Sequence, residues 1–229
     1  PLDAELLAVD ADGSGTLGFE PGVDPYASGE MPLPPYIRRD AAQPEDADRY
    51  QTTFSRVPGS IAAPTAGLHL SERLLDELAQ RGIERAELVL HIGVGTFRPL
   101  RDEDLARHRL HDEAFELPAA TAAAIDRARE RGGRVVAVGT TVTRVLEARA
   151  CEAGRVRAGS GTTDLFLAPG DRFRCVDALL TNFHLPRSSL LLLAAAYAGR
   201  ERLLAAYAEA VRSGYRFYSY GDAMLIESD

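Results

Sequence analysis

The sequence predicts an α/β fold, in which a mixed, largely parallel sheet is flanked by helices and the remnant of a small β-barrel-like unit lies at the N-terminus. Three observations support this prediction. Strand-like and helix-like segments alternate through the middle of the chain, glycines follow several helices, and a turn-rich stretch precedes a proline-rich one. We expect residues 1–28 to hold the small β unit and its linker, and residues 29–229 to form one α/β domain.

The first part of the chain is predicted to contain a hairpin, a linker, one helix and one strand. Ala4–Val9 and Gly15–Phe19 flank an Asp-Gly-Ser-Gly turn, a pattern typical of hairpins. Residues 21–48 are rich in Pro and Gly, which favours a stiffened connection. Residues 71–82 have a serine N-cap, helically spaced leucines and a terminal glycine, whereas Glu84–Ile92 alternates like a strand.

The second part is predicted to alternate between helices and strands. Proline at the first helical position and a terminal Gly-Gly pair support the first helix, and Gly199-Arg200 separates the last two. The expected helices cover Pro118–Arg131, residues 140–152, Ser188–Ala198 and Glu201–Arg212, and the expected strands cover Arg134–Val138, Thr163–Leu167 and Tyr215–Tyr220.

Composition excludes several classes of chemistry. All 26 basic residues are arginines against 34 acidic residues, so the 229-residue chain carries a net charge of −8 and no lysine. Schiff-base and pyridoxal-phosphate lysines and the P-loop lysine are therefore excluded. Two cysteines without metal-ligand spacing favour a reduced, cytoplasmic protein, and the longest apolar run, Leu190–Ala198, is too short to span a bilayer. The spacing of His108, His111 and Glu113 is not a specific ligand pattern, so no metal site is expected.

Two predicted strand ends carry residues suited to ligand binding. His91 is followed by Gly93-Val94-Gly95-Thr96, and Gly139-Thr140-Thr141 opens a helix with free N–H groups and hydroxyls. His69 and His184 lie in loops rich in small or polar residues. A tight turn with a structural strand histidine explains the His91 pattern at least as well. Any single one of these histidines is more often a structural hydrogen-bonding residue than a catalyst.

A cluster near the C-terminus combines aromatic rings with charge. On a strand, Arg216, Tyr218, Tyr220 and Asp222 would share one face. The simple interpretation is an edge strand with aromatic cross-strand packing. The alternative is a pocket wall that stacks a base and holds a cation with ring faces and a carboxylate.

Polar and glycine-containing blocks recur in order along residues 29–226. They cover residues 31–38, 50–52, 62–69, 90–97, 111–113, 138–147, 181–188 and 215–224. These blocks resemble the successive signatures of one enzyme family, the S-adenosylmethionine:tRNA ribosyltransferase-isomerases of queuosine synthesis. Arg187 and Leu70 stand where that family usually has a lysine and an aromatic residue. Family members also carry a substantial N-terminal portion that is absent before Pro1, so we expect a fragment or processed form in which residues 1–20 end that portion.

The resemblance implies a transferase-isomerase that moves the ribosyl moiety of S-adenosylmethionine onto the 7-aminomethyl-7-deazaguanine base of tRNA. Epoxyqueuosine forms, and adenine and methionine leave. S-adenosylmethionine is then a ribosyl-donor substrate with no permanently bound cofactor, and residues 29–229 are the catalytic domain of a cytoplasmic monomer. An acidic chain must meet tRNA through a local arginine patch, for which Arg38, Arg39, Arg187 and Arg216 are the candidates.

This chemistry needs a base to remove a proton beside the sulfonium and an acid to assist adenine departure. By resemblance, His91, His184 and His69 are the catalytic candidates, and Asp222 stabilises the sulfonium or acts as a base. The expected substrate-binding residues are Tyr50, Gln51, Thr65, Gly67, Gly93, Gly95, Thr96, Gly139, Thr140, Thr141, Arg144, Thr181, Asn182, Arg187, Arg216, Tyr218 and Tyr220.

Two other interpretations remain open at this stage. One is a truncated, non-catalytic homologue that binds nucleoside or RNA. The other is an S-adenosylmethionine-dependent methyltransferase, although the chain lacks an early strand-loop-helix fingerprint with a downstream acidic residue.

Overall fold

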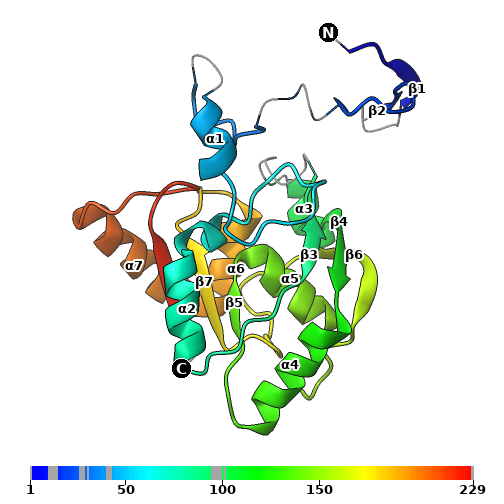
Figure 1. Ribbon diagram of the computed structural model, residues 1–229. Coiled ribbons are helices and arrows are strands. Elements are labelled where there is room, and N and C mark those ends of the chain that lie inside the picture. The colour runs from blue at the N-terminus through cyan, green and yellow to red at the C-terminus, as the bar shows by residue number, and fades with distance from the viewer. Residues whose placement is uncertain are drawn as a thin grey trace.

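The computed structural model describes residues 2–9, 15–25, 29, 31–39, 43–93, 100 and 102–227. Its described strands form three small sheets, with the orders β1-β2, β3-β4-β6 and β5-β7-β8 (Figure 1). The predicted mixed α/β class is confirmed. The largely parallel sheet is wrong, because among the described strands only β5 and β7 pair in parallel.

The N-terminal hairpin is present as predicted. β1 (Glu5–Val9) pairs antiparallel with β2 (Gly15–Gly18), and Figure 1 shows this hairpin standing apart from the rest of the molecule. Two strands alone do not make a barrel, so the barrel remnant stays a prediction. The predicted linker contains a short helix, α1 (Pro44–Arg49), with a buried carboxylate at Asp46.

The second sheet is antiparallel and comprises β3 (Val89–His91), β4 (Arg109–Leu117) and β6 (Gly159–Leu165). The sequence did not predict β4, because its many charged residues hide the strand pattern. Its buried residues nevertheless alternate, with Glu113, Phe115 and Leu117 pointing inward.

The third sheet positions most of the polar loops described below. β5 (Val136–Val138) runs parallel to β7 (Ala178–Asn182), and β8 (Ala223–Glu227) runs antiparallel to β7. α5 (Thr140–Arg149) packs on β5, β6 and β7 and so joins the second and third sheets through one core. Gly139 begins this helix with φ of 96°, a conformation that favours glycine.

Five more α-helices and a 3₁₀ turn complete the described part. They are η2 (Thr65–His69), α2 (Glu72–Gln80), α3 (Asp102–Arg107), α4 (Ala119–Glu130), α6 (Ser189–Ala198) and α7 (Arg200–Arg212). Ser71 and Ser188 cap α2 and α6 by accepting from the N–H groups of Leu74 and Leu191, whereas Pro118 is the N-cap of α4 rather than its first residue. Among the described residues, no helix has both the length and the hydrophobicity that a bilayer crossing requires.

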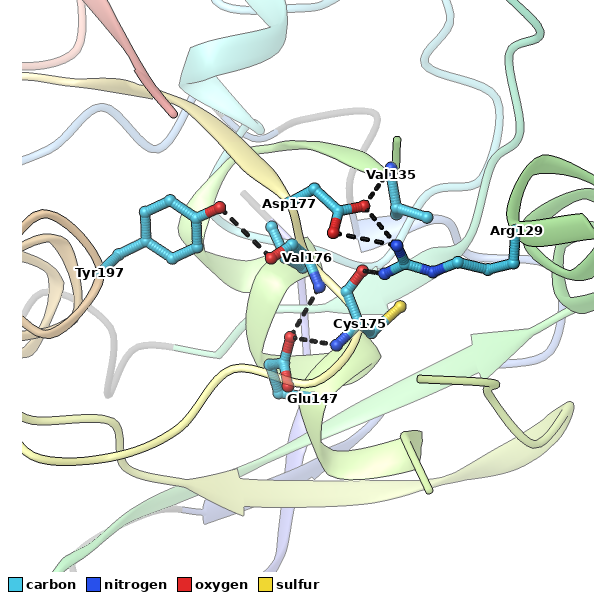
Figure 2. A network of polar contacts seen from close by, with 7 residues as sticks. All are labelled: Arg129, Val135, Glu147, Cys175, Val176, Asp177 and Tyr197. Atoms are coloured by element: carbon cyan, nitrogen blue, oxygen red, sulfur yellow. Dashed lines mark hydrogen bonds and ion pairs between the residues drawn. The ribbon is translucent and has the colours of Figure 1, made fainter. Parts of the chain in front are cut away.

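A polar clamp fixes the segment that enters β7 (Figure 2). The buried Glu147 of α5 accepts hydrogen bonds from the backbone N–H groups of Arg174, Cys175 and Val176, at 2.6, 3.0 and 2.9 Å. Arg129 of α4 donates to the Cys175 carbonyl at 2.5 Å and to Asp177 at 2.9 Å. This clamp fixes where β7 starts, and therefore where its other end carries Thr181 and Asn182.

Candidate active site

A cavity of about 490 Å³ opens where α1, η2 and the loop 216–221 meet. Of the predicted site residues, His69, Arg216 and Tyr220 line this cavity. The complete lining comprises Arg39, Asp46, Arg49, Leu68, His69, Arg216, Ser219, Tyr220 and Gly221. The cavity thus combines three arginines, one carboxylate, one histidine and one tyrosine.

The orientation of His69 is set from the end of β7. The Thr65 hydroxyl donates to Asn182 Oδ1 at 3.0 Å, which leaves the Asn182 amide nitrogen, 3.2 Å from His69 Nε2, as the donor to that ring atom. In the neutral ring, the proton then lies on Nδ1. The predicted residues Thr65, His69 and Asn182 are therefore one hydrogen-bonded unit.

Gly67 allows η2 to dock closely. A Cβ at this position would lie 2.7 Å from Phe54 Cζ and 3.0 Å from Thr52 Cγ2. A glycine is therefore required at position 67 because Phe54 and Thr52 pack against it.

Thr181 and His184 form a second unit at the end of β7. His184 Nε2 lies 2.7 Å from Thr181 Oγ1, and the His184 backbone N–H donates to the Tyr207 hydroxyl at 2.8 Å. Burial lowers the pKa of His184 to about 4, because removal from water disfavours the charged ring. The imidazole is therefore neutral at pH 7.

The loop 216–222 is closed on itself, so the predicted strand Tyr215–Tyr220 is wrong. The Asp222 N–H donates to the Arg216 carbonyl at 2.8 Å, while the Arg216 N–H donates to Asp222 Oδ2 at 2.7 Å. A Cβ on Gly221 would lie within 2.5 Å of the Arg216 and Phe217 backbone. Tyr218, with φ of 74°, occupies the left-handed region. Asp222 thus bonds to its own loop, and it is not among the cavity-lining residues.

Aromatic rings attach this loop to the segment that carries α1. The Tyr36 hydroxyl lies 2.5 Å from Ser219 Oγ, and the Tyr36 and Tyr218 ring centroids are 5.2 Å apart. Tyr50 meets Tyr220 edge-to-face at 5.9 Å. Tyr50 is almost fully buried, and burial raises its pKa to about 12. Predicted residues Tyr50, Tyr218 and Tyr220 thus come together, although through a turn and not along a strand face.

Asp46 is a cavity-lining residue that no sequence motif indicated. Arg39 donates two hydrogen bonds to the Asp46 carboxylate, from Nε at 2.7 Å and from an Nη at 2.9 Å. The Tyr220 hydroxyl donates to the same carboxylate at 3.3 Å. The Arg39 hydrogen bond lowers the pKa of Asp46. Nothing local marked Asp46, because its partners are seven and 174 residues away in the chain.

The arginine patch is reproduced in part. Arg39 and Arg216 line the cavity together with Arg49, which was not a candidate. Arg38 and Arg187 are exposed but are not among its lining residues.

Other predicted residues lie elsewhere. His91 is on β3, in a different sheet from β7, and its ring lies close to Gly59. Gly139, Thr140 and Thr141 begin α5, and Gly139 donates its N–H to the Leu180 carbonyl at 2.9 Å. Arg144 is buried and donates to Glu113 at 2.7 Å. Gln51 is exposed and Gly93 follows β3, while Gly95 and Thr96 lie outside the described residues.

Comparisons with known proteins give one consistent result. A family model described as queuosine biosynthesis protein matches residues 2–226. A Moorella thermoacetica S-adenosylmethionine:tRNA ribosyltransferase-isomerase is 53% identical over 98% of this chain and 66% of its own length. An Anaeromyxobacter dehalogenans protein of the same name is 59% identical over 87% of this chain and 57% of its own length.

A solved structure agrees with these relatives. The crystal structure of a Thermotoga maritima S-adenosylmethionine tRNA ribosyltransferase matches with a TM-score of 0.58 and 45% identity, over 70% of this chain and 51% of that chain. This chain spans about three fifths of the length of the curated relatives it matches.

Proposed function

The chain belongs to the family of queuosine biosynthesis proteins, and from this membership we propose that it transfers the ribosyl moiety of S-adenosylmethionine to the 7-aminomethyl-7-deazaguanine base of tRNA. S-adenosylmethionine is the ribosyl donor, and epoxyqueuosine, adenine and methionine are the products. We propose that the chain acts in the cytoplasm, as a monomer. The observation that carries the proposal is the cavity in which His69, held by Asn182, lies among three arginines and Tyr220.

We propose that His69 assists adenine departure as a hydrogen-bond donor. Its Nε2 accepts from Asn182, so the Nδ1–H is the group that can bind the leaving nitrogen as negative charge develops there. The Thr65–Asn182 pair fixes which ring atom donates.

The other three catalytic candidates, His184, Asp222 and His91, differ in how far the structure supports a role in catalysis. The neutral ring of His184 is a form that accepts a proton, but its lowered pKa makes it a weak base, so we propose that it mainly orders the end of β7. Asp222 closes the loop that presents Ser219 and Tyr220 to the cavity. His91 stays a prediction, as does a direct catalytic role for Asp222.

The charges of the cavity suit both substrates. Arg49 and Arg216 supply cationic donors for RNA phosphates, while the hydrogen-bonded Arg39–Asp46 pair and Tyr220 line the same cavity. The ring of Tyr220 offers a π-face to a sulfonium, which favours a cation without requiring a fixed negative charge.

Adenine release from S-adenosylmethionine in the presence of precursor tRNA tests this proposal. His69→Ala is expected to lower the rate by about 10²–10³-fold, the usual loss when one positioned hydrogen-bond donor is removed. Asn182→Ala keeps the ring but loses its orientation, so a smaller loss is expected. Arg81→Ala, at the exposed end of α2, is the matched control. Full activity of a folded His69→Ala variant would contradict the assignment.

A second function is supported by the length comparison alone. Because the chain spans about three fifths of its relatives, a homologue that binds nucleoside or RNA without turnover is the alternative. Binding of precursor tRNA without release of adenine would favour it.

A further inference from the structure

A second cavity, of about 540 Å³, lies where β6 ends and β4 begins. It shares no described lining residue with the candidate active site. Three arginines and one histidine face two carboxylates around it, namely Arg109, Arg172, Arg174, His108, Asp164 and Asp171.

Both carboxylates of this second cavity are already engaged. Asp171 Oδ2 accepts the Ala168 N–H at 2.8 Å and lies 3.2 Å from His108 Nε2. Asp164 forms an ion pair with Arg109. Because both carboxylates already bind groups of the cavity wall, they repel an incoming anion less than free carboxylates would.

Two of the three arginines are more available than the acids. Arg172 is exposed and, within the part of the chain that the structure describes, has no hydrogen bond or ion pair. Arg174 pairs at 3.1 Å with Glu152, whose side chain is 91% exposed. Exposed ion pairs of this kind contribute little, so another anion can replace Glu152.

A buried cation lies behind the same wall. Arg144 is 5% exposed and donates through Nε to the carbonyl of Leu165, a cavity-lining residue, at 2.9 Å. One of its Nη atoms pairs with Glu113, and the other has no hydrogen-bond partner among the described residues. The Arg144–Glu113 ion pair therefore supports Leu165 in the cavity wall from behind without adding net charge.

We propose that this second cavity binds a phosphodiester of the RNA substrate's backbone, away from the proposed reaction site. The inference rests on the proposed function. A guanidinium group can donate two parallel hydrogen bonds to the oxygens of one phosphate. Contacts of this kind with the nucleic-acid backbone orient a protein on the nucleic acid without reading its sequence. A chain with net charge −8 must concentrate these contacts in local patches.

The position of the second cavity agrees with this role. Figure 1 shows α1, which contributes Asp46 and Arg49 to the candidate active site, at the same end of the molecule as the junction of α3 and β4, where the second cavity lies. One RNA molecule approaching this end can therefore reach both cavities.

The test compares Arg172→Ala with the control Arg81→Ala, since each removes one exposed arginine. The dissociation constant for precursor tRNA is measured from 50 to 300 mM NaCl by filter binding. Loss of one phosphate contact is expected to reduce the log–log salt slope by about one and to weaken binding about eight-fold at 0.1 M salt. Arg81→Ala is expected to retain the wild-type slope and affinity.

The possible outcomes separate this inference from the proposed function. If wild-type protein shows no salt-dependent tRNA binding, the proposed function fails for this chain and the inference fails with it. If wild type binds tRNA and Arg172→Ala keeps the wild-type slope, only the inference is overturned. Binding of inorganic phosphate, lost in Arg172→Ala while its tRNA slope stays unchanged, would assign the cavity to a small anion and also overturn it.

Discussion

Replacement of His184 by glutamine is expected to flatten the pH dependence of the protein's stability. The ring lies at the end of β7, with Nε2 2.7 Å from Thr181 Oγ1. Burial lowers its pKa to about 4, from the usual value of 6.5. The unfolded chain therefore takes up a proton at His184 before the native protein does, and acid shifts the equilibrium toward the unfolded state.

The magnitude follows from these two values. The contribution of His184 to stability is fully present above about pH 6.5 and is lost as the pH falls through about 4. The complete loss corresponds to about 3 kcal/mol, of which about 1.4 kcal/mol disappears between pH 8 and pH 5.5. Other groups that titrate in this range change the stability of wild type and variant by the same amount.

Urea unfolding at pH 8 and pH 5.5, followed by circular dichroism, measures the effect. Wild type should lose about 1.4 kcal/mol more between the two pH values than His184→Gln does. His108→Gln, which removes a histidine whose side chain is 53% exposed, controls for the loss of any one histidine. Equal losses in wild type and His184→Gln would refute the conclusion that this ring is buried in its neutral form.

Three further predictions concern the framework of the site, and urea unfolding at pH 7.5 measures each. Glu147→Gln removes the charge that binds three backbone N–H groups and is expected to cost about 3 kcal/mol; a loss below about 0.5 kcal/mol would contradict the clamp. Gly67→Ala is expected to lower the free energy of unfolding by about 1–3 kcal/mol through its clash with Phe54. Phe54→Ala removes that clash, so it should destabilise the Gly67→Ala variant less than it destabilises wild type. Glu113→Ala leaves Arg144 buried without its carboxylate and should cost about 3–5 kcal/mol, so a stable variant would show that the pair is dispensable.

Locally encoded parts of the fold could be predicted from the sequence. Ser71 and Ser188 mark helix starts because a serine hydroxyl satisfies a free N–H within the same short segment. β4 was missed because charged residues such as Glu113 occupy inward positions, where only a distant partner, Arg144, makes burial tolerable. Residues 215–220 were predicted as a strand because their aromatic side chains favour strands, whereas the Arg216–Asp222 hydrogen bonds enforce a turn.

In the candidate site, too, local features were predictable and long-range contacts were not. Short motifs marked His69, Thr65 and Asn182, although their contact across more than a hundred residues was not predictable from spacing. Asp46 gave no signal, since a carboxylate in a charged helix usually lies at the surface. Its burial depends on Arg39 and Tyr220, which only the folded chain brings to it.

Ribosyl transfer itself is tested most directly with two batches of S-adenosylmethionine, one labelled in the ribose and one in the methyl group. Each is incubated with the protein and with tRNA that carries 7-aminomethyl-7-deazaguanine. Ribosyl transfer requires that the ribose label enters the tRNA, that the methyl label leaves with methionine and that free adenine accumulates. Methyl label in the tRNA together with S-adenosylhomocysteine, or tRNA binding without any transfer, would contradict it.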